Sequence, residues 1–593
     1  MPAQEEDGRL SVQSAREFLL RPRDPIEIER TLVTLPGRSM TITASAEMLF
    51  QAIAPTNTLF YRGGTVMELI HGETGPEFSV LDAVGAQSRF EKYAMFHKPP
   101  RVIGQGQGEP AVLTEAQAKQ YLKSEACRTL LPKLKGLVHC PFLTERDGQV
   151  RQVNSGYDPT TGIYVIAGNT PPQSVSLEEA VDMLQGLLAE FDFLTPSDQS
   201  RALASLITPA LKMGGFVRGQ LPIDVAEANT SQSGKGYRQR LIGAVYNSKL
   251  AVVAERNGGV GSMDEAFCDH LIKGRMFIQL DNLRGKLDST YLESFMTGDG
   301  SHFNARSAYH KNANVDPSEY FIYITSNGFE ATKDLTNRAS IIRIRKRENY
   351  AYRLLNGRGL LELASTDFQP FLLGAVFAVV EEWVRRGKPR TDDTRHDFRE
   401  WCQTLDWIVQ NIFHSAPLMD GHENAKARAA NPHLTFLRAL AINLNTHHQY
   451  GRWLKASNLA DRCIQDDVEV PGISAAGQTS EAAARRIGKI MGGLFENAQQ
   501  VDQHTSQIDM DGLIVRRRIR SGTSDTGNRM PIKEYQFSDA TQVGDVAGTE
   551  AQPALDDDTD DTAPLACDTV EDDDPLPPVP RLTMSPSPNQ EKQ

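Results

Sequence analysis

An apolar run that passes directly into a polar loop restricts the fold of this 593-residue chain more than any other segment. The run PIDVAEA (222–228) precedes NTSQSGKGYRQRLIGAVY, which reads as a turn followed by a helix. Small residues at such a turn let backbone N–H groups surround a phosphate, while a lysine contacts its oxygens. The segment predicts a phosphate-binding loop of Walker A type, with nucleotide contacts from Ser233, Gly234, Lys235 and Gly236.

Two positions depart from that pattern. Asn229 stands where the first glycine usually lies, which is a mild change because asparagine tolerates left-handed backbone. Gly236 replaces the serine or threonine whose hydroxyl normally binds Mg²⁺. By itself, the segment is equally compatible with a polar turn between a strand and a helix.

Two later strand-like segments end in polar residues. The interval from Lys235 to Asp281 equals the interval from Asp281 to Asn327. RMFIQLDN ends in Asp281-Asn282, and EYFIYITSN ends in Asn327. A carboxylate at the end of a buried strand holds the Mg²⁺ shell in P-loop enzymes, and an amide on a neighbouring strand orients water against the γ-phosphate. We expect these roles for Asp281 and Asn327, although a strand cap and a turn residue are the alternatives.

Eleven residues after Asn327, the stretch DLTNRASIIRIRK supplies Arg338. An arginine at this point is a candidate arginine finger for the nucleotide of a neighbouring subunit, and a solvated charge is the alternative. Four such elements in this order favour a P-loop ATPase that binds ATP and Mg²⁺.

The order of these elements resembles the superfamily 3 helicases of the AAA+ class. Residues 291–320 resemble their B′ motif, a hairpin that reaches into the central channel of a hexamer and grips single-stranded DNA. The resemblance implies that Arg306, His310 and Lys311 contact DNA; an exposed polar loop is the alternative.

The resemblance extends upstream and covers about 131–347. Residues 131–165, and GYDPTTGIY (156–164) most specifically, resemble the region that precedes the helicase domain in phage and plasmid primase-helicases. Residues 1–200 contain neither zinc-ribbon cysteines nor an Asp-x-Asp pair for two catalytic metals. A primase is therefore expected on a separate chain.

The catalytic pattern is incomplete at one position. Many ATPases of this class have a glutamate as general base directly after the strand-end aspartate, whereas Asn282 stands there and cannot take a proton. Glu265 and Glu293 are the alternatives for polarising water. Together with Gly236, this leaves open a DNA-binding regulator with a vestigial nucleotide site, and an ATPase that loads or remodels a partner protein.

The C-terminal part resembles a winged-helix DNA-binding module. Residues 453–465 and 480–498 predict two helices, and DGLIVRRRIR and PIKEYQFS predict a two-stranded wing. An apolar stripe on the second helix comprises Ile487, Ile490, Met491 and Leu494. The residues expected to contact duplex DNA, mainly through phosphates, are Arg485, Arg486, Lys489, Arg516, Arg517, Arg518 and Arg520. A protein-docking module with a solvated basic strand is the alternative.

These patterns predict an α/β P-loop core of AAA+ type flanked by smaller regions. A strand-rich segment (1–100) carries a hairpin turn at Gly63–Gly64, and an α+β segment contains a helix with a Ser176/Glu179 capping box. The expected divisions are 1–100, 101–215, a core at 216–350, helices at 351–430, the winged-helix-like module at 431–540, and a disordered acidic tail at 541–593.

Charge, cysteine content and apolar runs indicate the cellular compartment. The tail carries −11 of the net charge of −13, so the other 540 residues are close to neutral and local basic clusters decide contacts with DNA. Six scattered cysteines form no CxxC pair, and the longest apolar run (371–380) is half a membrane span. With a polar, acidic N-terminus, we expect a cytoplasmic protein.

The resulting expectation is an ATP- and Mg²⁺-dependent DNA helicase or translocase, working as an oligomeric ring, expected to be a hexamer, in replication of a mobile genetic element such as a phage. Single-stranded DNA would lie in the channel and duplex at the C-terminal module. The sequence does not indicate translocation polarity or origin specificity.

Two lysines separate nucleotide chemistry from DNA contact. Lys235→Ala should abolish ATP turnover with or without DNA, because a charge-assisted contact to the γ-phosphate is lost. Lys311→Ala should lose the DNA-stimulated part of turnover and strand separation, and the salt slope of DNA binding should fall by about one. Duplex unwinding by Lys311→Ala at the parent's rate would contradict the hairpin assignment.

Overall fold

A computed structural model defines the fold for most of the chain. The described residues are 30–72, 75–99, 108–166, 170–228, 232–254, 262–283, 285–298, 302–306, 312–347, 350–466, 468–473, 479–510, 512–523 and 529–539. Asn229, His310, Lys311 and the acidic tail of the sequence analysis lie outside them. Within these residues, no helix combines the length and apolar character needed to cross a bilayer.

The phosphate-loop segment leaves the third strand of a six-stranded sheet, counted within the described residues. The strand order is β11-β20-β12-β18-β14-β13, and every neighbouring pair is parallel except β11 with β20. The bounds are β11 Asp192–Phe193, β12 Ile223–Ala228, β13 Ala251–Ala254, β14 Phe277–Leu283, β18 Phe321–Ser326 and β20 Ala339–Arg345. Parallel strands align their carboxyl ends, so the loops that follow β12, β14 and β18 meet at one edge.

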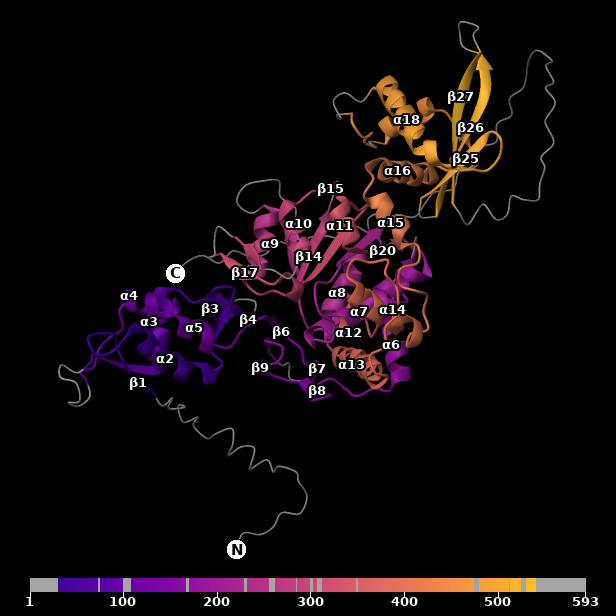
Figure 1. The fold of residues 1–593 in the computed structure, drawn as a ribbon. Helices are drawn as coiled ribbons and strands as arrows, with labels where there is room; N and C mark the ends of the chain where they lie inside the picture. Colours follow the sequence, from indigo (N-terminus) through magenta and orange to yellow (C-terminus); the bar gives the residue numbers. More distant parts are fainter. Residues whose placement is uncertain are drawn as a thin grey trace, which may run out of the picture. The chain divides into compact units, whose positions relative to one another are not determined.

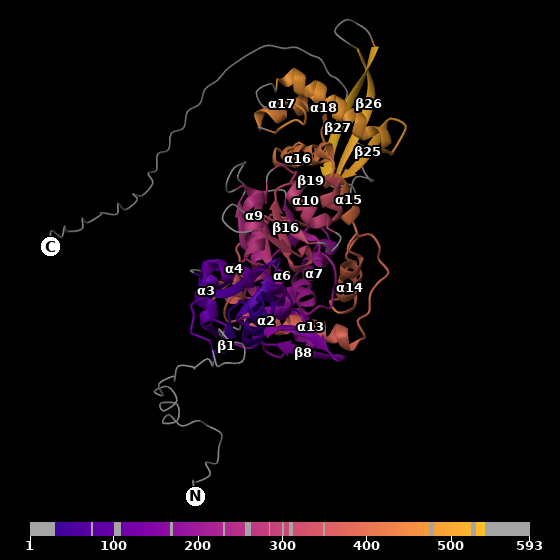
Figure 2. The ribbon, with the colours of Figure 1, turned by 60° about the vertical axis from the view of Figure 1, so that its left-hand side comes forward.

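Helices and short strand pairs surround this sheet. The bounds are α6 Leu177–Leu188, α7 Pro196–Met213, α8 Lys235–Val245, α9 Met263–Ile272, α10 Thr290–Thr297 and α11 Lys333–Asn337, with β15 Lys286–Leu287, β16 Phe303–Ala305, β17 Ala313–Val315 and β19 Glu330–Ala331. The predicted Ser176/Glu179 capping box starts α6, which confirms that prediction. Helix α7 begins with a similar box at Thr195 and packs against β20 and α14. Figure 2 shows α7 beside α14.

The described part of the N-terminal region contains the strands β1 to β5 with helices between them. One apolar cluster extends from Val33 to Leu131. The bounds are β1 Thr31–Thr34, α2 Ile42–Ile53, β2 Leu59–Arg62, β3 Thr65–Gly72, β4 Gly75–Val80, α3 Ala83–Glu91, β5 Ala94–His97, α4 Glu115–Leu122 and α5 Glu125–Leu130. The hairpin turn at Gly63–Gly64 is confirmed, with positive φ angles of 58° and 89°.

Short strands connect this region to the core. They are β6 Gly136–Val138, β7 Phe142–Arg146, β8 Gln149–Val153, β9 Gly156–Asp158 and β10 Ile163–Val165. The segment GYDPTTGIY forms the β9–β10 hairpin, where Asp158 Oδ2 accepts hydrogen bonds from the backbone N and Oγ1 of Thr161 (2.8 and 2.6 Å). Its conformation is therefore accounted for by local turn chemistry.

The segment after the core is helical, as predicted. It contains β21 Leu354–Leu355, β22 Arg358–Gly359, α12 Leu360–Ala364, α13 Gln369–Arg385, α14 Arg399–Asn411 and α15 His422–Ala429. Helix α13 packs against α6, α7 and α8, and its buried face joins the apolar cluster of the core. These helices therefore belong to the same packed unit as the phosphate loop.

The C-terminal module has its own apolar core. Its elements are α16 Pro432–Thr446, β23 Trp453–Leu454, α17 Ala456–Gln465, α18 Ser480–Leu494, β24 Gln499–Gln500, β25 Thr505–Met510, β26 Leu513–Thr523 and β27 Arg529–Asp539. Both predicted helices are confirmed, as α17 and α18. The predicted two-stranded wing is instead the long hairpin β26–β27 (Figure 1) within an antiparallel five-stranded sheet, because β23 and β25 pair with its two sides.

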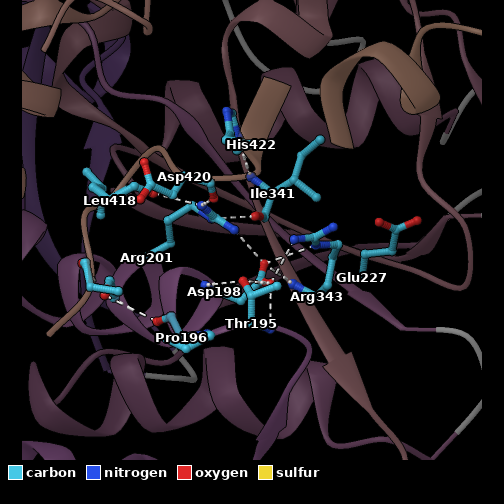
Figure 3. Close-up of polar contacts among 12 residues, drawn as sticks. Thr195, Pro196, Asp198, Arg201, Glu227, Ile341, Arg343, Leu418, Asp420 and His422 are labelled. Atoms are coloured by element: carbon cyan, nitrogen blue, oxygen red, sulfur yellow. Dashed lines mark hydrogen bonds and ion pairs between the residues drawn. The ribbon is translucent and has the colours of Figure 1, made fainter. Parts of the chain in front are cut away.

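A buried ion network joins α7 to β20 (Figure 3). The carboxylate of Asp198 accepts hydrogen bonds from Nη2 of Arg201 (2.6 Å) and from the backbone N and Nη2 of Arg343 (both 3.0 Å). Arg201 also donates from Nε to the carbonyl of Ile341 (2.8 Å) and from Nη1 to that of Leu418 (2.7 Å). Burial alone would raise the pKa of Asp198, but the two arginines outweigh it and hold the pKa at about 2.

Asp198→Asn should destabilise the protein by about 3 kcal/mol at pH 7, because two buried guanidinium groups lose their counter-charge. Since the folded pKa lies below the unfolded value, this contribution is present above about pH 4 and is lost as pH falls towards 2. Thermal denaturation midpoints across this range should converge for parent and variant. Asp367→Asn, which breaks a pair with Arg358 at a carboxylate that is 61% exposed, should change the midpoint little.

Candidate nucleotide and DNA sites

The described part of the phosphate loop has the backbone needed to surround an anion. Gln232 and Gly234 both adopt positive φ, at 61° and 89°, and Lys235 is the first residue of α8. The helix start at Gly234 has no side-chain cap. Its first N–H groups and the positive end of the helix dipole therefore face the loop.

The structure brings Lys235 and Asn327 together although 92 residues separate them. Lys235 Nζ donates a hydrogen bond to Asn327 Oδ1 and lies 3.4 Å from Ser233 Oγ. Burial lowers the pKa of Lys235, while the charges of Glu227 and Asp281 act in the opposite direction. A lysine held between these acceptors is positioned for phosphate oxygens at the strand edge.

The end of β14 presents Asp281 beside β18. Thr325 Oγ1 donates to Asp281 Oδ1 (2.7 Å) and accepts from the backbone N of Asn282 (2.6 Å). Asn282 has a φ of 54°, at a register shift between Leu280 and Leu283. This irregularity leaves the Asp281 side chain exposed at the strand edge, next to the loop.

Gly236 lies next to Asp281. A Cβ built on Gly236 would lie 3.8 Å from Asp281 Oδ1 and 3.8 Å from Gln279 Nε2, so a side chain fits there. No group of three or more His, Cys, Asp or Glu side chains that could hold a metal ion is present among the described residues. Asp281 nevertheless fits Mg²⁺, which commonly takes one or two carboxylates and completes its shell with phosphates and water.

Sequence reasoning missed the polar network beneath the loop. Asp224, on β12, accepts hydrogen bonds from Arg238 and from Gln239 Nε2 (3.0 Å), both on α8. Gln239 also receives a bond from Gln279 Nε2 (2.9 Å), on β14. The sequence feature that could have indicated this network is Asp224, a charged residue inside an otherwise apolar strand.

Glu227 is the second missed residue, on the opposite face of β12. Its buried carboxylate is paired with Arg428, on α15, and with Arg438 Nη1 on α16 (2.9 Å). It also accepts the backbone N–H of Phe329 (3.0 Å), two residues after Asn327. Burial would raise the pKa of Glu227, but the two arginines hold it below its usual value.

Arg338 lies at the opposite end of the sheet from the loop. Its carbonyl accepts a hydrogen bond from Ile223 N (2.9 Å), at the start of β12, while the loop follows Ala228 at the end of that strand. Five strand residues correspond to about 16 Å, longer than an arginine side chain. Arg338 is half-buried and donates to the carbonyl of Asp334 (3.2 Å) within its own helix.

The two alternative glutamates have local partners. Glu293, on α10, accepts a hydrogen bond from Thr332 Oγ1 at the start of α11. Glu265 lies in the first turn of α9, where its backbone N donates to Ser262 Oγ (3.3 Å). Glu227, which sequence reasoning did not consider, is the buried carboxylate whose charge acts on Lys235 together with that of Asp281.

The segment that resembles a B′ motif (291–320) contains a pair of strands. Strands β16 and β17 pair antiparallel, and Arg306 directly follows β16 as an exposed residue with its Nε 3.2 Å from Asn304 Oδ1. The turn of the N-terminal hairpin supports this pair, because Asn314 N donates to the carbonyl of Gly63 (3.0 Å). A Cβ on Gly63 would lie 2.2 Å from the Asn314 carbonyl oxygen, so the contact requires glycine.

The basic residues of the C-terminal module fall into two groups. On α18, Arg485 and Lys489 are exposed, and Arg486 donates to the carbonyl of Pro471 (2.7 Å). Ile487, Ile490 and Met491 are buried and Leu494 partly so, which confirms the apolar stripe.

The arginines of β26 alternate between two faces. Arg517 lies over the ring of Phe495 (4.8 Å). Arg518 lies over Trp453 (4.3 Å), and its Nε donates to Glu534 (2.7 Å). Arg516 is half-buried, whereas Arg520 is exposed. Arg517 and Arg518 thus already have aromatic or acidic partners within the module.

Comparison with known proteins gives little further. No described protein family matches the chain, and no curated protein does either. Among solved structures 54 chains match, including one titled "SCCmec type IV Cch - active helicase". That match has 11% identity and a TM-score of 0.27, and covers 81% of this chain and 91% of the other. This likeness is too weak to assign a fold or a function.

Gly236→Thr should place a hydroxyl beside Asp281 without steric conflict. If Asp281 holds Mg²⁺, the added ligand should lower the half-saturating Mg²⁺ concentration of ATP turnover by about three- to tenfold, equivalent to roughly 1 kcal/mol. Gly236→Ala is the matched control, since it adds a Cβ and no oxygen. Equal Mg²⁺ dependence of the two variants would contradict a metal at this position.

Proposed function

We propose that this protein is an ATP-dependent DNA helicase or translocase that works as an oligomeric ring, expected to be a hexamer, in the replication of a mobile genetic element. One observation carries the proposal. Three side chains, Lys235 at the start of α8 and Asp281 and Asn327 at two strand ends, converge at one edge of a parallel sheet. That is the arrangement a nucleoside triphosphate and Mg²⁺ require.

The strand order supports a P-loop core of AAA+ type. The strand that ends in Asn327 lies between the strand that carries the loop and the one that ends in Asp281. The amide that follows the middle strand therefore lies between Lys235 and Asp281, the side chains that would bind phosphate and metal. A structural role for these polar strand ends would not by itself require that placement.

The chemistry available at this edge is electrostatic. Lys235 would neutralise β- and γ-phosphate oxygens, and Asn327 would orient the attacking water. Mg²⁺, held by Asp281, would neutralise further phosphate charge when bound. Thr325 fixes the rotamer of Asp281 through its 2.7 Å hydrogen bond.

The position of Arg338 is compatible with an oligomer. It lies about a strand's length from its own loop, so if it acts as an arginine finger, it would complete the site of a neighbouring subunit. In a ring, the β16–β17 hairpin would face the channel, with Arg306, His310 and Lys311 on single-stranded DNA. The exposed Arg485, Lys489 and Arg520 would make phosphate contacts with duplex.

A second candidate is a DNA-binding regulator with a vestigial nucleotide site. Gly236 and Asn282 favour it, because each lacks the group that hydrolysis normally uses at its position. ATP turnover with and without single-stranded DNA separates the candidates. Stimulated turnover supports the motor, absent turnover the regulator, and DNA-indifferent turnover an ATPase that loads a partner protein.

Mixing two inactive variants tests the shared site. Arg338→Ala and Lys235→Ala should each lose ATP turnover by about a thousandfold. Mixed in equal amounts, they should recover up to roughly a quarter of parental turnover, because one interface in four combines an intact Lys235 with an intact Arg338. Lys333→Ala, an exposed lysine on the same helix, serves as the charge control.

Steady-state turnover over a range of protein concentrations provides the measurement. The parent should gain specific activity as it assembles. Full turnover by Arg338→Ala, or no recovery when assembled subunits are mixed, would remove the arginine-finger assignment.

A further inference from the structure

The loop has a second side, away from Asp281. Strands β14 and β18 flank β12 on one side, and β20 and β11 on the other. Because β11 is antiparallel to β20, with Asp192 opposite Arg345, the residues just before β11 lie at the carboxyl end of β20. That is the same sheet edge as the end of β12, where the phosphate loop begins.

Aromatic rings gather at this second side. Phe191 and Tyr237 have ring centroids 6.2 Å apart, and Tyr237 and Tyr352 are 5.7 Å apart. A Cβ on Gly234 would lie 3.0 Å from Phe191 Cε1 and 3.4 Å from Tyr352 Oη. The rings therefore begin directly at the loop, and Tyr352 remains 45% exposed.

Hydrogen bonds hold this cluster in place. Leu361 N donates to the Tyr237 hydroxyl (2.9 Å), which fixes the ring that α8 projects next to the loop. Arg347 lies over Tyr350 (4.7 Å) and donates to the carbonyl of Phe191 (3.4 Å). Two segments that are about 160 residues apart in the chain are thus tied together beside the loop.

A buried carboxylate beside the rings has one oxygen without a partner. Glu190 is 3% exposed, and its Oε1 accepts from the backbone N and Nε of Arg353 (3.1 and 3.0 Å). Its Oε2 is buried and accepts no hydrogen bond. Burial raises the pKa of Tyr237 and Tyr352, and the charge of Glu190 raises both further. The bond to the backbone N of Arg353 holds the carboxylate beside the residue that follows Tyr352.

An unpartnered carboxylate oxygen is costly in a protein interior and is satisfied if a ligand donates to it. A nucleotide whose phosphates lie at Lys235 must place its base within reach of the loop. On the Asp281 side, the proposed metal and attacking water would occupy that space. The base would therefore lie on the aromatic side.

We propose that Tyr237, Tyr352 and Glu190 form the base subsite of the nucleotide site and select adenine. The inference rests on the proposed nucleotide binding at the loop. The rings would stack on the base, and Glu190 Oε2 would accept a hydrogen bond from the 6-amino group. Guanine presents two adjacent donors that suit two carboxylate oxygens, whereas Arg353 leaves only one oxygen free. Glu190 thereby acts as the specificity-determining residue, and Tyr352 contributes stacking that does not distinguish the bases.

The test compares ATP with ITP, which carries a 6-carbonyl in place of the 6-amino group. Binding of each to the full chain with Mg²⁺ is measured by calorimetry. The parent should bind ATP about tenfold or more tightly than ITP. The reason is that the charged Glu190 Oε2 would face the 6-amino donor of ATP but the 6-carbonyl acceptor of ITP. In Glu190→Gln, the amide oxygen would accept from Arg353 and the amide N–H would face the base. The ratio of ATP to ITP affinity should therefore fall to about one or invert.

The ratio distinguishes base reading from loss of structure, which weakens both nucleotides equally. Tyr352→Leu should weaken both about tenfold with the ratio unchanged, and Tyr352→Phe should bind as the parent. Glu400→Gln, at a partly exposed ion-paired carboxylate on α14, is the matched control and should preserve the ratio.

An unchanged ratio in Glu190→Gln, or equal binding of ATP and ITP by the parent, would overturn the base subsite while nucleotide binding stands. Absence of binding by the parent, or binding unaffected by Lys235→Ala, would instead overturn nucleotide binding at the loop, and the base subsite with it.

Discussion

Two buried carboxylates on β12 set the conditions for the rest of the core. Asp224 and Glu227 lie on opposite faces of a fully buried strand, where an unpaired charge would cost several kcal/mol. Each is compensated by arginine: Arg238 for the first, and Arg428 with Arg438 for the second. The strand that carries the phosphate loop is therefore held on both faces by ion pairs, and the elements that supply the arginines have to pack where they do.

The parallel sheet brings the residues of the candidate site together. Because neighbouring strands share a direction, the ends of β12, β14 and β18 open onto one edge, and residues far apart in the chain meet there. The order of the strands divides that edge in two. Asp281 and Asn327 lie on one side of the loop, and the aromatic residues beside Glu190 lie on the other.

Contacts with the core also reach the regions proposed to bind DNA. Glu227, two residues before the loop segment, is bonded to Arg438 of α16, whose apolar residues belong to the C-terminal core. On the N-terminal side, Arg62 donates to the carbonyls of Leu271 and Ile272 at the end of α9 (3.0 and 2.9 Å). With the Gly63–Asn314 contact, these bonds support the base of the β16–β17 hairpin from outside the core.

The sequence by itself determined the elements whose signals are local. Strand ends at Asp281 and Asn327, the helix start at Lys235, the Ser176 capping box and the stripe on α18 all follow from neighbouring residues, and the structure has each. Helix α2 also had a local signal, since Ala46, Leu49, Phe50 and Ile53 are buried at helical spacing, and sequence reasoning passed over it. Only the tertiary structure decided which strands are neighbours, that the wing joins a five-stranded sheet, and which partners compensate Asp224, Glu227 and Glu190. The physical reason is that burial and charge compensation join residues such as Glu227 and Arg438, which are 211 positions apart, and no local pattern records such pairings.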